Sequence, residues 1–114
     1  MSKWVFRCLI ENQSQAVIAM KYFYAHDKYT QKPPEIPPGE GTVEAEGNGY
    51  VAGWYEMIIQ GDIFLITFSF LPGGTPGCKA NRLILGPSPK FGVEVVDVES
   101  AGHTGTAQIQ VFPR

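Results

Sequence analysis

Alternation of apolar and polar residues with a period of two recurs along the chain and constrains its fold more than any other feature. Successive side chains of a strand point to opposite faces, so such a run presents one apolar face. The runs are short and end at Gly, Pro, Asn or Asp, and no segment shows a helical period of useful length. In the first run one face holds Trp4, Phe6, Cys8 and Ile10, and the other holds Val5, Arg7, Leu9 and Glu11. The sequence therefore predicts an all-β protein.

The remaining expected strands differ in strength. Residues 54–59 and 63–70 form the two strongest, and Gln60-Gly61-Asp62 between them is typical of a tight hairpin. Residues 63–70 also give the predicted centre of the core, with Phe64, Ile66, Phe68 and Phe70 on one face. Another strand is expected over residues 17–24. One of its faces would hold Ile18, Met20, Tyr22 and Tyr24, and the other would hold Val17, Ala19, Lys21 and Phe23. Shorter strands are expected over residues 42–46, 82–85, 92–98 and 106–112.

Proline and glycine divide these strands. Pro33-Pro34 and Pro37-Pro38 predict that residues 27–41 are irregular, because proline lacks a backbone donor. Gly47-Asn48-Gly49 predicts a turn, and residues 72–77 predict a long loop. About eight short strands in a chain of 114 residues, 44% of them hydrophobic, favour a single compact antiparallel β-sandwich over residues 1–114. A small barrel is the alternative.

Charge and the first residues bear on partners and location. The formal net charge is −2 and the basic residues are scattered, so we expect no nucleic-acid partner. Residues 1–4 lead directly into the first strand, without the apolar segment of a signal peptide. The longest apolar stretch, residues 63–71, is too short for a membrane span. We expect a soluble protein made in the cytoplasm, which would leave the cell by lysis or by a leaderless route.

Few residues suit catalysis. Glu44 and Glu46 alternate on one side of a strand, as solvated neighbours do, rather than facing each other across a substrate. His26 and the adjacent Asp27 would point in opposite directions on a strand, and His103 lies in a turn. We therefore expect no enzyme activity and no cofactor.

The two cysteines, Cys8 and Cys78, leave two alternatives open. In a chain without a leader, both are expected to be reduced and partly buried thiols. The alternative is a disulfide that ties the first strand to the Pro/Gly-rich loop. Two cysteines and two histidines do not supply an obvious metal site.

Aromatic residues in polar, flexible segments give the clearest functional signal. Tyr50, Trp54 and Tyr55 lie near Gly47-Asn48-Gly49, and Tyr29 lies beside Lys28 in the proline-rich stretch. Tyrosine and tryptophan combine an apolar body with a polar tip, which suits protein interfaces, sugar stacking and membrane headgroups. Any one of them could instead cap the core. Together they predict a loop-borne binding surface, with Lys28 and Tyr29 as its secondary members.

The order of several segments resembles the aegerolysin family, which includes the small components of bacterial binary insecticidal toxins. Residues 9–14 match the family's first strand and its Asn-containing turn, and Pro34-Glu35-Ile36 matches a proline segment farther on. Residues 47–56, a glycine-rich turn that leads a hairpin, match best, followed by Gln60-Gly61-Asp62, residues 70–74 and Asn81. The family's Trp-Asp-Cys-Pro-Trp segment is replaced here by Phe70-Leu71-Pro72.

This resemblance implies a β-sandwich that recognises membrane lipids, typically sphingolipid headgroups. It also implies a larger partner protein that perforates the membrane, with toxicity to insect or other cells as the consequence. Two other functions stay open. One is a small lectin, in which the same aromatic residues stack on sugar rings beside Asn48, Glu56 and Asn81. The other is a structural protein that assembles into a homo-oligomer through an edge strand at residues 42–46.

Overall fold

Ten β-strands cover most of the described residues, which are residues 2–83 and 88–114 of this computed structural model. Their bounds are β1 (Lys3–Asn12), β2 (Ile18–Ala25), β3 (Lys28–Gln31), β4 (Glu35–Ile36), β5 (Gly39–Asn48), β6 (Val51–Ile59), β7 (Asp62–Phe70), β8 (Gly77–Arg82), β9 (Phe91–Ala101) and β10 (Thr104–Pro113). No helix occurs in this part of the chain, so none there is long enough to cross a membrane. The prediction of an all-β protein is confirmed, with ten strands in place of about eight.

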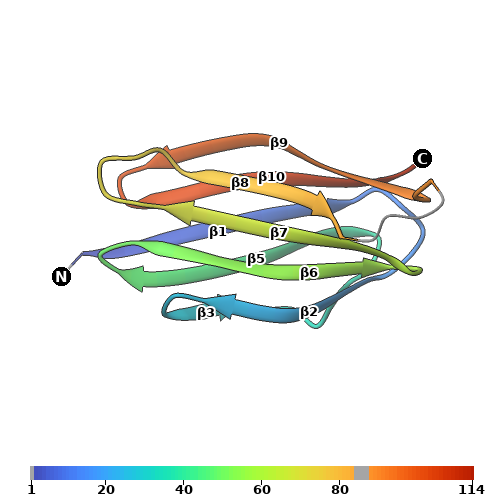
Figure 1. Cartoon of the computed structure of the whole chain (residues 1–114), viewed down its shortest axis with the longest axis horizontal. Coiled ribbons are helices and arrows are strands. Elements are labelled where there is room, and N and C mark those ends of the chain that lie inside the picture. The colour runs from blue at the N-terminus through green and yellow to red at the C-terminus, as the bar shows by residue number, and fades with distance from the viewer. Residues whose placement is uncertain (1, 84–87) are drawn as a thin grey trace.

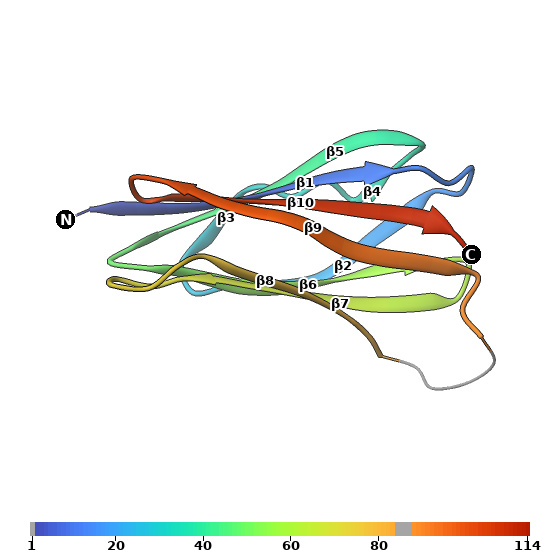
Figure 2. The ribbon, with the colours of Figure 1, turned by 90° about the horizontal axis from the view of Figure 1, so that it is seen from above.

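The strands form two five-stranded sheets that pack face to face as a sandwich (Figures 1 and 2). Sheet A has the order β3-β5-β1-β10-β9, and sheet B has the order β4-β2-β6-β7-β8. The predicted β-sandwich is confirmed. The pairing of β1 with β10 is parallel, however, whereas the other pairings among the described residues are antiparallel. No hairpin joins these two strands, so connectivity does not force them to run in opposite directions.

The core lies where the alternation predicts it. The inward faces of β1 and β7 are buried, and they hold Trp4, Phe6, Cys8, Ile10, Phe64, Ile66, Phe68 and Phe70. Aromatic rings join the two sheets through this interior. The ring centroids of Phe6 and Phe68 are 5.0 Å apart, and Trp4 meets Phe70 edge-on at 4.8 Å. On β10 the residues Ala107, Ile109 and Val111 are also buried.

The hairpin between β6 and β7 forms as predicted. Gln60 and Gly61 have positive φ angles of 46° and 90°, as the two central residues of a type I′ turn require. The strands then pair without a break from Ile59 and Asp62 to Val51 and Phe70.

The buried side-chain amide of Asn12 stabilises the turn between β1 and β2. Asn12 Nδ2 donates hydrogen bonds to the carbonyls of Ala16 (2.7 Å) and Ile36 (3.1 Å). Asn12 Oδ1 accepts from the backbone N–H of Ser14 (3.0 Å) and from its hydroxyl (2.7 Å). The first side chain of this turn is therefore an interior group that also binds the backbone of β4.

Residues 27–41 contain more regular structure than predicted. β3 pairs with β5, β4 pairs with β2, and β5 already begins at Gly39. The four prolines lie between these strands, where a missing donor breaks no ladder hydrogen bond. Residues 44–46 of β5 are paired with β1 on one side and β3 on the other. The predicted edge strand at residues 42–46 is therefore largely covered, and assembly through it is not supported.

The strand after the glycine-rich loop is also displaced from its predicted position. The prediction placed it over residues 82–85, whereas β8 ends at Arg82 and Leu83 follows it as an exposed residue. Ile84 and Leu85 lie outside the described residues. The loop lets the chain return directly along β7, and Cys78 and Ala80 provide the small inward side chains of the new strand.

Candidate functional site

The two outer surfaces of the sandwich differ in chemistry. We call the solvent-facing side chains of sheet A face A, and those of sheet B face B. Face A carries seven carboxylates and three basic groups, a formal charge of −4, from Glu11, Glu40, Glu44, Glu46, Glu94, Asp97 and Glu99 against Lys3, Arg7 and Lys28. On face B the charges cancel, with Glu35 and Glu56 against Lys21 and Lys79.

Apolar and polar side chains alternate in rows across face B. One cross-strand row is apolar and runs from Ala19 to Ile58 and Ile63. The neighbouring row is mostly polar, with Leu65 among Lys21, Glu56 and Asn81. A third row places Tyr24 beside Trp54, then Thr67 and Lys79. The exposed rings of Tyr24 and Trp54 in this row suit a contact surface for a partner, a ligand or a membrane.

A bulge in β2 exposes two tyrosines that the sequence alternation turns inward. Lys21 pairs with Glu56 and Tyr24 pairs with Trp54, so β2 contains one extra residue at this point. Tyr22 has a positive φ of 56°, and the alternation changes phase there. Tyr22 and Tyr24 are consequently 63% and 57% exposed, while Phe23 packs against the core. The prediction that Tyr22 and Tyr24 share a face with Met20 is wrong for this reason.

Tyr24 and Trp54 form the centre of the exposed aromatic surface. Their ring centroids are 6.0 Å apart and their planes differ by 20°. Behind them, the Tyr29 hydroxyl lies 2.8 Å from the Tyr24 carbonyl and 2.9 Å from the Trp54 carbonyl, and its one hydrogen is shared between these two acceptors. Gly53 permits this approach, because a Cβ there would lie 2.4 Å from the Tyr24 carbonyl oxygen and 3.1 Å from the Tyr29 hydroxyl. Burial raises the pKa of the Tyr29 phenol well above its ordinary range.

The structure distributes the five predicted site residues over different parts of the molecule. Trp54 lies on face B with 37% exposure, whereas Tyr55 is 0% exposed and has no surface to offer a ligand. Tyr29 links the two sheets, and Lys28 lies on face A, 3.2 Å from Glu46. Adjacent residues of a strand point to opposite sides, so the alternation alone could have separated Trp54 from Tyr55.

Tyr50 lies at the end of the sandwich that also holds the β9–β10 turn (Figure 1). It stacks on His26 with centroids 3.8 Å apart, and its hydroxyl is hydrogen-bonded to His26 Nδ1 at 2.8 Å. The other histidine of this end, His103, stacks on Trp4 at 4.0 Å with nearly parallel planes. Both imidazoles are thus held flat against aromatic rings that close the end of the core.

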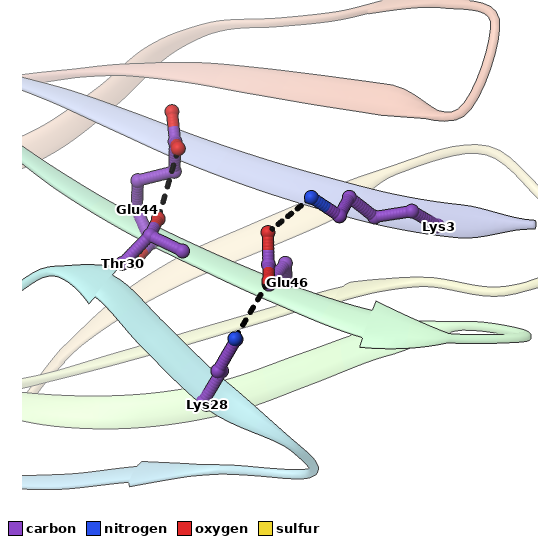
Figure 3. A network of polar contacts seen from close by, with 5 residues as sticks. All are labelled: Lys3, Lys28, Thr30, Glu44 and Glu46. Carbon is purple, nitrogen blue, oxygen red and sulfur yellow. Dashed lines mark hydrogen bonds and ion pairs between the residues drawn. The ribbon is translucent and has the colours of Figure 1, made fainter.

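Ion pairs organise the carboxylates of face A (Figure 3). Glu46 binds Lys3 at 3.0 Å and Lys28 at 3.2 Å, which ties β5 to both neighbouring strands. The hydrogen bond from Lys3, followed by that from Lys28, lowers the pKa of Glu46. Glu44 accepts hydrogen bonds from Thr30 and Arg7, each at 2.8 Å. Glu44 and Glu46 therefore join strands of sheet A, and they do not face each other across a cleft.

The two cysteines are free thiols that approach each other across the interior. Cys8 is buried on β1, and Cys78 is half-buried on β8. The hydrogen bond with Cys78 and burial both raise the pKa of the Cys8 thiol well above its ordinary value. A thiol with a raised pKa is a poor nucleophile. Burial also raises the pKa of Tyr55. Its hydroxyl lies near the two thiols and has no hydrogen-bond partner of ordinary length among the described residues.

The best-defined hollows are small. One of about 150 Å³ lies on face A between Glu11, Glu40 and Gln110, and one of about 290 Å³ lies between Phe91 and Arg82 at the open side of the sandwich. Pockets for small organic ligands usually measure about 300–1,000 Å³. Within residues 2–83 and 88–114, no group of three His, Cys, Asp or Glu residues could hold a metal ion. Both hollows are smaller than such pockets.

Comparison with protein-family models and with curated protein sequences finds no match to this chain.

Proposed function

We propose that the protein is a non-enzymatic binding protein that docks on a membrane surface through face B. The observation that carries this proposal is the contrast between face B, which has no net charge and exposes the aromatic rings of Tyr22, Tyr24 and Trp54, and an acidic face A. Aromatic rings with polar tips favour the headgroup layer of a membrane. Because the charges of face B cancel, zwitterionic lipids are expected to suit it better than anionic ones.

The resemblance to aegerolysins gives this proposal its finer form. It makes sphingolipid headgroups the preferred lipid class, and a larger pore-forming protein the partner in a two-component toxin. Face A would remain exposed to solvent when face B is docked, so it is the surface on which such a partner would act.

Co-sedimentation with protein-free vesicles tests the proposal. Three compositions are compared: phosphatidylcholine alone, phosphatidylcholine with sphingomyelin, and phosphatidylcholine with ceramide phosphoethanolamine. We expect binding that increases when either sphingolipid is present. Absence of binding to all three compositions would reject membrane docking, and equal binding to all three would reject only the sphingolipid preference.

A matched pair of variants tests which face docks. Trp54 on face B and Leu9 on face A have the same fractional exposure of 37%, so truncating them alters equally accessible apolar side chains on opposite sides. Trp54→Ala should weaken vesicle binding at least about tenfold, as expected for an aromatic anchor. Leu9→Ala should leave binding unchanged. Equal losses in both folded variants would contradict docking through face B.

A glycan is the second candidate ligand, because of one specific geometric feature. The neighbouring rings of Tyr24 and Trp54, inclined by only 20°, form a platform on which a sugar ring could stack. Glu56 and Asn81 lie in the adjacent row of face B and offer hydrogen-bonding groups, whereas Asn48 lies at the end of β5. Hits on a glycan array, together with no binding to glycan-free vesicles, would favour this function over lipid recognition.

A further inference from the structure

Tyr22 is an inserted residue that the pairing of the sheet does not need. On β2, three residue steps lead from Lys21 to Tyr24, while on β6 two steps lead from Glu56 to Trp54. Without Tyr22, the strand would keep Lys21 outward, Phe23 inward and Tyr24 outward in regular alternation. The bulge therefore adds one side chain to the surface and otherwise leaves the pattern of the strand unchanged.

The backbone at Tyr22 is in an unfavourable conformation for this residue type. Its φ of 56° lies in the left-handed region, which a bulky L-residue rarely occupies. Among the described residues, Gln60 is the one other non-glycine residue with a positive φ, and it occupies a tight turn that requires this angle. Glycine is the usual residue at such a bulge position. The presence of tyrosine there works against the stability of the strand.

The Tyr22 ring gains little from the fold in return. Its side chain is 63% exposed, the largest exposure among the large hydrophobic residues described. The next residue, Phe23, shows what a structural ring does at this place. It packs against Tyr29 at 5.1 Å and against Tyr55 at 5.6 Å. Strained residues that contribute no packing are concentrated at functional sites.

We propose that the β2 bulge presents Tyr22 to the ligand, and that Tyr22 is a principal contact residue of face B together with Trp54. This inference rests on the proposed membrane docking and adds a specific residue and backbone device to it. Tyr22 lies on β2 two residues before Tyr24, whose ring stacks on Trp54 of the neighbouring strand β6. An exposed ring held on a bulge can enter the headgroup layer without any change in the sheet.

The experiment compares thermal stability and vesicle binding in the same variants. Tyr22→Gly removes the ring and relieves the backbone conformation, so we expect an unchanged or raised melting temperature and about tenfold weaker binding to phosphatidylcholine–sphingomyelin vesicles. Tyr22→Phe keeps the ring and should bind within about twofold of the wild type. Gln60→Gly relieves a similar φ at a turn outside face B, so it should not weaken binding.

The outcomes separate this inference from the proposed function. Wild-type binding by Tyr22→Gly, with binding lost in Trp54→Ala, would overturn the role of Tyr22 and leave membrane docking intact. A lower melting temperature in both Tyr22→Gly and Tyr22→Asn would show that the ring supports the fold, and would also overturn it. Failure of the wild type to bind any vesicle would reject the proposed function itself.

Discussion

Face A and face B belong to sheets of five strands each, yet different kinds of contact stabilise them. On face A, exposed charges form cross-strand ion pairs, such as those of Glu46 with Lys3 and Lys28. On face B, charges are few. The backbone carbonyls of Tyr24 and Trp54, whose rings are exposed, are bound by the hydroxyl of Tyr29 from the opposite sheet. Face A thus depends on contacts within its own layer, whereas face B depends on a contact between layers. The difference gives three predictions of decreasing effect.

The largest effect is expected at Gly53, where β6 lies against β2, Phe68 and the Tyr29 hydroxyl of the opposite sheet. A Cβ in Gly53→Ala would lie 2.4 Å from the Tyr24 carbonyl oxygen and 2.7 Å from Phe68 Cζ, so strands must move. We expect a loss of about 3 kcal/mol in the free energy of unfolding, measured by urea denaturation. Gly74→Ala is the control, because its Cβ would meet its nearest neighbour at an ordinary 3.5 Å. Equal stability of the two variants would break the claim that face B depends on this contact.

A smaller effect is expected from Tyr29→Phe. The change removes the hydroxyl that binds the carbonyls of Tyr24 and Trp54 and keeps the ring that packs on Phe23. We expect a loss of about 1–2 kcal/mol at neutral pH, together with weaker vesicle binding.

This variant also has a signature in alkaline solution. Because the pKa of Tyr29 is raised in the folded protein, its contribution is complete below the ordinary phenol pKa of about 10 and is lost as the pH rises further. Unfolding of the wild type should therefore become easier above about pH 10, and less so in Tyr29→Phe. Parallel pH profiles of the two proteins would contradict the buried role of this hydroxyl.

The smallest effects are expected on face A, and they should have opposite signs. The pKa of Glu46 is lowered by Lys3 and Lys28, so its charge stabilises the fold at neutral pH and this is lost as the pH falls through that pKa. The pKa of Glu99 is raised by its hydrogen bond to Asp97, so its charge opposes folding at neutral pH and protonation relieves this. At pH 7, Glu46→Gln should lower the melting temperature slightly and Glu99→Gln should raise it slightly.

Measurement of both melting temperatures at pH 7 and near pH 4 checks these signs, since the two differences from the wild type should shrink in acid. Vesicle binding should be unchanged in both variants if face A stays in solvent. A loss of binding in either one, with the fold intact, would require face A to contribute to docking.

Sequence reasoning was most successful where local chemistry decides. The Gln60-Gly61 turn and the inward series Phe64, Ile66, Phe68 and Phe70 follow from turn preferences and a period of two, and the structure confirms them. It failed where a distant strand decides. β4 is two residues long and exists because β2 offers it a partner, and β8 starts five residues earlier than predicted because it pairs with β7.

For the candidate site, too, some features follow from the sequence and others only from the tertiary structure. The sequence by itself determined the all-β class, the core of β1 and β7 and the presence of aromatic residues outside that core, since these depend on alternation and composition, whereas the choice of a sandwich over a small barrel needed the structure. The tertiary structure alone decided that Lys28 belongs to face A, because β3 pairs with β5, and that Tyr22 and Tyr24 reach the surface. For the two tyrosines, the physical reason is that one extra residue in β2 reverses the direction of every side chain after it. Its position is set by pairing with β6, a strand that lies about thirty residues away in the sequence.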